Sequence, residues 1–302
     1  MSLTLDALAI LDAIDRRGSF ARAAEELGRA PSSLTYAVQQ IEAELDVLLF
    51  DRSGHRARFT AAGRVLLDEG RTLLSAAQAL ENRTRQVAGG WEPHFTLALE
   101  GILPLAPLLP LLDDFYQLGH TTEIRLRQEV LAGSWDALAC GRADLVIAGG
   151  DAPAGGGIRT RALGSIEFVF CVAPQHPLAR LDQPLSQANI AAYRAVVIAD
   201  TARNLPLRSA GWLQQQQPRL TVPDLPGKLA AQQVGLGVGS LPRWLAVQEV
   251  AAGRLVQCPW AGGNPHETLY LAWRSGEAGR ALDWFIRALS RPGMFAGVLD
   301  DA

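Results

Sequence analysis

Two short apolar patterns separated by a tight break most constrain what this chain can fold into. In each pattern an apolar side chain recurs every three or four residues, namely Phe20, Ala23, Ala24 and Leu27 in the first and Leu34, Val38, Ile41 and Leu45 in the second. This spacing places the apolar side chains along one stripe of an α-helix. The break at residues 28–31 is so short that the two helices must pack at an angle across a turn. The pattern therefore predicts a helix-turn-helix.

The opposite face of the second predicted helix is polar but carries no charge. It consists of Ser32, Ser33, Thr35, Tyr36, Gln39 and Gln40. Glutamine can bond an adenine, and serine or threonine can donate or accept at a base edge, so this face suits the major groove of DNA. The alternative is a pair of helices in an ordinary all-helical domain that binds no DNA.

A basic segment follows the second predicted helix. Between residues 52 and 67 no carboxylate interrupts the basic side chains, which are Arg52, His55, Arg56, Arg58 and Arg64. Ser53 and Gly54 predict a turn, and residues 57–60 can form a short strand. A basic hairpin after a recognition helix is typical of a wing, which contacts phosphates or the minor groove. We therefore expect DNA contacts from Arg52, His55, Arg56 and Arg58.

Four segments in this part of the sequence follow a known pattern, namely GSFARAAEELG at residues 18–28, IEAEL at 41–45, LFDR at 49–52 and FTAAG at 59–63. In these segments the sequence resembles the LysR-type transcriptional regulators of bacteria. Two positions depart from the family pattern. Asp46 stands where the family usually has a glycine, and the second helix lacks the basic residue that is often found near Tyr36.

A heptad pattern after the wing predicts a dimerising helix. Its positions are spaced alternately by four and three residues, and they are Leu66, Gly70, Leu73, Ala77, Leu80, Thr84 and Val87. A helix over residues 61–88 would be roughly 40 Å long, and we expect its seam to need a second copy of the chain. Small residues on the seam, Gly70 and Ala77, would let two helices approach closely. Alternatively, Leu67 and Leu74 bury the helix against its own domain.

From Phe95 onward strands alternate with helices, which predicts a doubly wound α/β fold. We expect strands at residues 95–99, 123–128, 145–148, 167–173, 195–199, 238–241 and 268–273. We expect helices at 105–118, 135–140, 185–193, 212–216, 228–234, 243–251 and 279–289. The family resemblance continues more loosely at 141–145, 176–179, 235–238 and 241–242. It implies a co-inducer domain of two lobes, similar in fold to periplasmic solute-binding proteins.

The overall prediction is therefore an α/β protein with an N-terminal all-α winged helix-turn-helix and a long linker helix. The expected boundaries are residues 1–60 for the DNA-binding domain, 61–90 for the linker and 91–302 for the effector domain. Within the effector domain we expect one lobe at about 91–162 and 267–302, and the other at about 163–266.

By the same resemblance, an effector would bind between the lobes, next to residues that follow the strands. These are Glu100, Gly101, Ile102, Glu129, Val130, Gly149, Asp200, Thr201 and Arg203. Glu100 departs from the family, because its position often holds a small hydroxyl residue that binds a carboxylate ligand. We therefore expect an effector with an amine, a hydroxyl or an aromatic body. The alternative is that Glu100 pairs with an arginine such as Arg203 or Arg208.

The charge balance constrains how DNA would be bound. The chain has a net charge of −3, and residues 1–90 contain 11 arginines against 12 acids. A near-neutral domain lacks the usual basic footprint, so we expect one copy to bind weakly and affinity to come from linked copies. The resemblance implies a homodimer and then a homotetramer, and RNA polymerase as a partner if the protein is an activator.

Other function classes find little support. Cys140, Cys171 and Cys258 are far apart and have no metal-ligand spacing, so we expect a reduced cytoplasmic setting, no cofactor and no metal. We find no catalytic motif, no secretion signal and no membrane-length apolar run, and we expect no enzyme activity. A two-lobed enzyme or solute-binding protein with an incidental helical appendage remains the alternative. The near-neutral charge argues against a non-specific architectural DNA protein.

Overall fold

The computed structural model describes residues 3–51, 58–89, 91–153, 157–181, 184–209, 216–277 and 279–300. The chain forms two compact units, Met1–Val87 and Ala88–Ala302, and each is described by itself. Arg52, His55 and Arg56 of the predicted wing lie outside the described residues, as does most of the predicted helix at 212–216.

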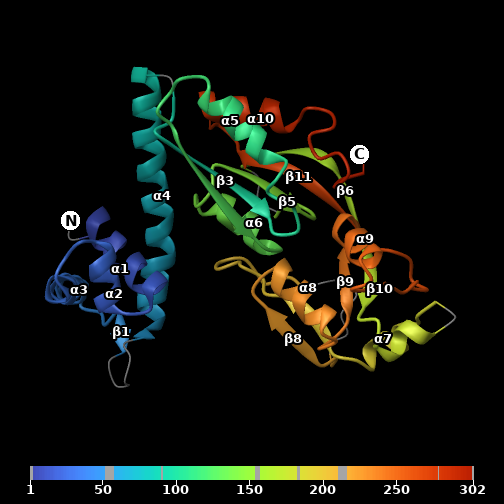
Figure 1. Cartoon of the computed structure of the whole chain (residues 1–302). Helices are drawn as coiled ribbons and strands as arrows, with labels where there is room; N and C mark the ends of the chain where they lie inside the picture. The colour runs from blue at the N-terminus through green and yellow to red at the C-terminus, as the bar shows by residue number, and fades with distance from the viewer. Residues whose placement is uncertain are drawn as a thin grey trace. The chain divides into compact units, whose positions relative to one another are not determined.

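The first unit consists of three short helices, a two-stranded hairpin and one long helix (Figure 1). The elements are α1 (Leu5–Arg17), α2 (Phe20–Glu26), α3 (Pro31–Leu45), β1 (Phe50–Asp51), β2 (Arg58–Phe59) and α4 (Ala61–Gly89). The two predicted helices of the helix-turn-helix are thus α2 and α3. Most of their predicted apolar stripes meet in one core, to which Ala23, Ala24, Leu34, Val38 and Ile41 contribute buried side chains. Leu45, the last residue of the second stripe, is 40% exposed and lies outside this core.

Local residue choices explain where these helices begin and end. Ser19 caps α2, because its hydroxyl accepts a hydrogen bond from the Arg22 N–H. Pro31 occupies the first turn of α3, where its missing N–H costs nothing. Asp46 ends α3 with a φ of 51°, in the left-handed region that favours glycine. The departure at Asp46 therefore keeps the conformation that a glycine would supply.

The first half of α4 packs on its own unit, which corrects part of the predicted dimer seam. Leu67 is buried in the core of the unit, and Leu66 packs against that core. A Cβ on Gly70 would lie 2.7 Å from a methyl carbon of Leu8. The missing side chain at Gly70 therefore lets α1 pack closely on α4, and this position does not face a second chain. The seam prediction is wrong for Gly70 because the helix turns this side inward.

Further along α4 the predicted seam remains exposed. Leu73 and Leu80 are 51% and 67% exposed in the single chain. Ala77 is half-buried, and Thr84 is exposed with its hydroxyl donating to the Leu80 carbonyl at 2.9 Å. The side chain of Val87 lies outside the described residues.

The second unit is a mixed α/β domain, as predicted. Its strands are β3 (His94–Glu100), β4 (Glu123–Glu129), β5 (Leu145–Gly149), β6 (Ile158–Val172), β7 (Ala195–Ile198), β8 (Arg219–Val222), β9 (Gly239–Pro242), β10 (Val256–Gln257) and β11 (His266–Arg274). Its α-helices are α5 (Leu108–Tyr116), α6 (Ala132–Ala139), α7 (Gln187–Ala191), α8 (Leu225–Gln233), α9 (Arg243–Ala251) and α10 (Arg280–Leu289). One 3-10 helix, η1 (Pro177–Arg180), precedes α7.

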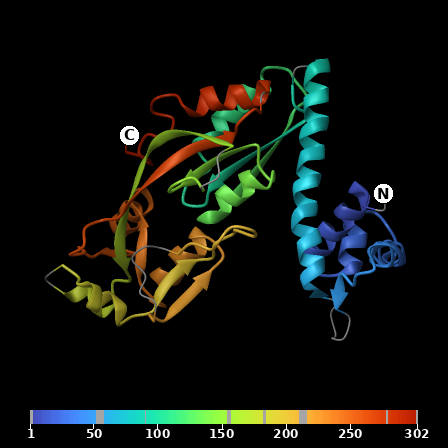
Figure 2. The same cartoon turned by 180° about the vertical axis from the view of Figure 1, so that it is seen from behind.

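The long strand β6 joins two lobes, as both views of the domain show (Figures 1 and 2). Its first part pairs with β11 in the lobe that contains β5, β3 and β4, in that order, and its last part pairs with β9 and β10 in the other lobe. Strands β3, β4 and β5 are parallel, and β11 is antiparallel to β5. In the first lobe α5 and α10 cover one face of the sheet and α6 covers the other.

Strand β6 begins nine residues before the predicted start at Glu167. Arg159, Thr160 and Arg161 are exposed, so this part of the strand has no apolar pattern that could be read from sequence. Pairing with β11 makes it a strand. The parallel pair β7–β8 forms a separate two-stranded sheet in the second lobe, and β8 was not predicted.

Candidate nucleic-acid interface and effector site

The predicted recognition face of α3 is open to solvent. Tyr36 is 68% exposed, the side chains of Ser32, Ser33, Gln39 and Gln40 are exposed, and Thr35 is half-buried. Three of these side chains form hydrogen bonds with residues of the same helix or its N-cap. Ser33 donates to the Ala30 carbonyl, Thr35 to the Pro31 carbonyl and Gln40 to the Glu44 side chain. The Gln39 side chain makes no hydrogen bond with any described residue, so its amide can contact a base edge.

Ion pairs on the other side of this unit neutralise much of its charge. Asp12 and Asp15 of α1 accept hydrogen bonds from Arg71 of α4 at 2.8 Å each, and Asp15 also pairs with Arg64 at 2.9 Å. Burial opposes ionisation of Asp12, but the hydrogen bonds from Arg16 and Arg71 outweigh it and lower the pKa of this carboxyl. Asp12 and Asp15 of α1 thus hold α1 against α4.

The buried side chain of Glu42 holds the start of the hairpin in place. Glu42 of α3 accepts hydrogen bonds from the N–H groups of Leu49 and Phe50, at 2.8 Å and 3.1 Å. Strand β1 then pairs with β2, where Phe50 lies opposite Phe59. Arg58 on β2 is exposed, and it is the one predicted wing contact that falls within the described residues.

In the second unit, Glu100 ends β3 as a buried carboxyl group, 4% exposed. Its Oε1 accepts from the Leu131 N–H at 2.9 Å, and its Oε2 accepts from the Ser134 hydroxyl at 2.7 Å. Burial, with a smaller contribution from the nearby Glu267 carboxyl group, raises the pKa of Glu100 to about 8. No arginine among the described residues pairs with Glu100, so the alternative of an arginine partner is wrong for this part of the chain.

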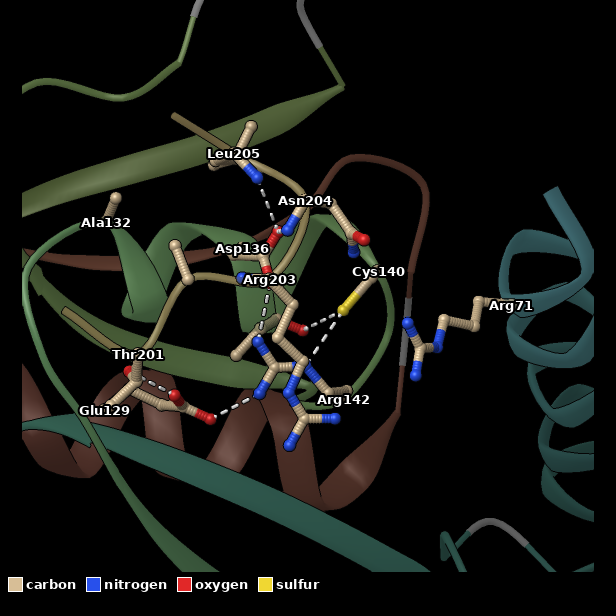
Figure 3. A network of polar contacts seen from close by, with 12 residues as sticks. Arg71, Glu129, Ala132, Asp136, Cys140, Arg142, Thr201, Arg203, Asn204 and Leu205 are labelled. Carbon is tan, nitrogen blue, oxygen red and sulfur yellow. Dashed lines mark hydrogen bonds and ion pairs between the residues drawn. The ribbon is translucent and has the colours of Figure 1, made fainter. Parts of the chain in front are cut away.

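A second network ties the segment after β7 to the first lobe (Figure 3). Arg142 bridges two buried acids, at 2.6 Å from Glu129 and 2.8 Å from Asp136. Thr201 donates from its hydroxyl to Glu129 at 2.6 Å and accepts from the Val130 N–H at 2.9 Å. Asp136 also accepts from three successive N–H groups, those of Arg203, Asn204 and Leu205, at 3.1 Å each.

A third group surrounds Gly149 at the end of β5. The Gly149 carbonyl accepts from the Trp135 indole at 3.0 Å and from Arg208 at 3.1 Å. Arg208 also lies 3.7 Å from Glu267, and a Cβ on Gly149 would lie 2.8 Å from a Glu267 oxygen. Burial raises the pKa of Glu267, although Arg208 opposes this rise.

Seven of the nine predicted effector residues lie in the networks around α6, and Gly101 and Ile102 are the other two. Glu100, Glu129, Val130, Gly149, Asp200, Thr201 and Arg203 all take part in the networks around α6. Ile102 differs, because its side chain belongs to the apolar core and its carbonyl accepts from the Trp244 indole. Gly101 donates from its N–H to the Glu129 carbonyl at 2.7 Å.

Sequence reasoning missed Ser134, Asp136 and Glu267 in these networks. Glu267 is the second residue of β11, and it lies beside Gly149 because β11 pairs with β5, where Leu269 is opposite Gly149. Ser134 and Asp136 lie on α6, but no periodicity distinguishes them from solvent-facing polar residues. Only the pairing of distant segments brings these groups together.

A winged helix-turn-helix on a long helix, followed by a two-lobed α/β domain, defines a DNA-binding regulator with a ligand-binding domain. Comparison with known families agrees. Residues 5–64 match the bacterial regulatory helix-turn-helix proteins of the lysR family, and residues 88–291 match the LysR substrate binding domain. The chain belongs to the LysR family of transcriptional regulators and is not an enzyme.

Similar proteins cover almost the whole chain. It is 42% identical to the probable HTH-type transcriptional regulator YhaJ of Escherichia coli (strain K12), over 98% of both chains. It is 34% identical to the HTH-type transcriptional regulator PunR of the same strain, over 93% of this chain and 91% of PunR.

Solved structures share the fold. The crystal structure of ArgP from Mycobacterium tuberculosis is 22% identical and covers 98% of each chain with a TM-score of 0.57. Full-length CbnR complexed with its target DNA is 20% identical, covers 95% of this chain and 99% of CbnR, and has a TM-score of 0.57. Among the described helices of the present chain, none has the length and apolar character needed to cross a membrane.

Proposed function

We propose that this regulator reads a specific operator through the outer face of α3 and grips the flanking phosphates through its wing. The bases would be contacted by Ser32, Ser33, Thr35, Tyr36, Gln39 and Gln40, and the phosphates by Arg52, His55, Arg56 and Arg58. The observation that carries the proposal is the exposed, uncharged, hydrogen-bonding face of α3, in a unit where Asp12 and Asp15 of α1 pair with Arg71 of α4. Regulators of this family bind DNA and small-molecule effectors and form oligomers.

A pair of chains would present two recognition helices to a pseudo-palindromic site. We assign the contact between chains to the exposed part of α4, chiefly Leu73, Ala77 and Leu80. Residues 1–60, 61–90 and 91–302 would then act as DNA-binding domain, linker and effector domain. Two such dimers would form a tetramer, in which several weak contacts to DNA add up.

The effector would bind between the two lobes, next to the side chains that gather around α6 and the end of β3. Binding would favour one arrangement of the lobes and so change how the dimers present their helices to DNA. Because transcription takes place on the chromosome, we assign the protein to the cytoplasm. If it activates transcription, RNA polymerase would be a further partner.

Protection of genomic fragments from nuclease cleavage tests the proposal. We expect one or a few protected sites that contain half-sites about one helical turn apart. Gln39→Ala should relax sequence preference at one base pair, at a cost of about 1–3 kcal/mol. Arg58→Ala should weaken all sequences alike and lower the salt dependence by about one counterion. Thr72→Ala, at an exposed position of α4, is the control. It should change neither the sequence preference nor the salt dependence of binding.

Two outcomes would contradict this division of roles. If Gln39→Ala and Arg58→Ala changed specific and non-specific binding by the same factor, the helix would not be the element that reads bases. If no fragment were protected at any salt concentration, the proposed DNA interface would be wrong.

A further inference from the structure

The N-terminus of α6 is the natural anion site of the first lobe, because backbone N–H groups at a helix start point outward and carry partial positive charge. In this chain those N–H groups are already taken. Leu131 donates to Glu100 at 2.9 Å, Ala132 donates to Asp200 at 3.2 Å, and Val130 donates to the Thr201 hydroxyl. The protein thus supplies two carboxyl groups of its own, those of Glu100 and Asp200, as acceptors for N–H groups at this helix start.

These internal groups come from separate parts of the chain and fit closely. Glu100 ends β3, whereas Asp200 and Thr201 follow β7 of the second lobe. A Cβ on Gly133 would lie 1.9 Å from the Thr201 hydroxyl oxygen, so this segment packs directly on the first turn of α6. The Asp200 carboxylate is also held by the N–H groups of Ala202 and Arg208, at 2.8 Å and 2.7 Å.

The surrounding groups offer little to an anion. Glu267 is a further acidic group, which contributes to the raised pKa of Glu100, and its side chain is 26% exposed. Arg208, the cation beside it, is already engaged with the Gly149 carbonyl and lies 3.7 Å from Glu267. A ligand here would therefore meet acceptor oxygens, and a carboxylate would find no unused backbone donor at Val130, Leu131 or Ala132.

We propose that Glu100 and Asp200 are specificity-determining residues, which exclude carboxylate effectors and select a ligand that donates hydrogen bonds through an amine or a hydroxyl. This inference rests on the proposed effector site and names the class of ligand for it. Glu100 has the larger influence, because it also takes the Ser134 hydroxyl that would otherwise hold a ligand oxygen. Removing the Glu100 carboxyl group leaves the Leu131 N–H and the Ser134 hydroxyl without their acceptor.

Calorimetric titration of the full chain with matched ligands tests the proposal. The probes are benzoate, benzylamine and benzyl alcohol, and acetate, ethylamine and ethanol as a smaller set. We compare the wild type with Glu100→Ser, which opens the donors, and with Glu100→Gln, which fills the same space and keeps an acceptor for Leu131. Circular dichroism establishes that each variant is folded.

We expect Glu100→Ser to bind at least one carboxylate about 10- to 100-fold more tightly than the wild type, as restored hydrogen bonds to a charged group would provide. Glu100→Gln should show no such gain. The proposal is overturned if the wild type binds either carboxylate as tightly as Glu100→Ser does, or if the folded Glu100→Ser variant gains no carboxylate affinity. Nuclease protection on the same samples separates the two proposals, because a protein that protects its operator but fails the titration contradicts only this inference.

Discussion

Replacing Glu100 by glutamine should make the effector domain more stable at neutral pH and flatten its response to pH. Glu100 is 4% exposed, and burial raises its pKa to about 8, against about 4.5 in the unfolded chain. Between these values the folded protein holds a proton that the unfolded chain has lost. The stabilisation of the folded protein by this raised pKa is therefore fully present below about pH 4.5. It is lost as the pH rises towards the pKa of about 8 in the folded protein.

The magnitude follows from the two pKa values. Each pH unit in this window lowers the free energy of unfolding by about 1.4 kcal/mol per proton. Allowing for partial ionisation near pH 5, the loss between pH 5 and pH 7 is about 2.5 kcal/mol. Glutamine resembles the protonated acid in shape, can still accept from the Leu131 N–H, and can donate to the Ser134 oxygen. It therefore avoids this loss.

Urea unfolding of the full chain at pH 5, 6, 7 and 8, followed by tryptophan fluorescence, measures the effect. The transition of the effector domain should have nearly the same midpoint in both proteins at pH 5, which serves as the internal control. The variant should then become progressively more stable than the wild type up to pH 8. Parallel pH profiles for the two proteins would refute the reasoning, because they would show that Glu100 does not bind its proton more tightly in the folded state.

Two further predictions concern the first unit. Gly63→Ala should destabilise it by about 1–3 kcal/mol, because a Cβ there would lie 2.2 Å from the Leu49 carbonyl oxygen; an unchanged melting temperature would show that the hairpin adjusts freely. Leu80→Glu should shift the dimer towards monomer in sedimentation, since a charge on the seam opposes burial. Val65→Glu is the matched control, because Val65 is 64% exposed on the same helix but outside the seam, and equal effects of the two changes would argue against the seam.

Local residue spacing was enough to predict several elements of this protein. The apolar stripes of α2 and α3 predicted both helices and their common core, because a period of three to four residues leaves one helical face that must be buried. The short apolar runs of β3, β5 and β11 predicted strands within one or two residues of their observed ends. The family resemblance marked Asp46 as a position that usually holds a glycine. Its left-handed conformation at the end of α3 explains why glycine suits that position.

Contacts between residues far apart in the chain could not be predicted from local spacing and required the folded structure. The spacing of α4 could not reveal that Gly70 lies against Leu8, because several stripes of one helix are apolar and packing selects among them. Likewise Glu100 could be singled out in sequence, but its partners Leu131 and Ser134 could not. Their meeting depends on strand order and on where α6 crosses the sheet. These are fixed by the burial of many side chains at once, and no local pattern carries that information.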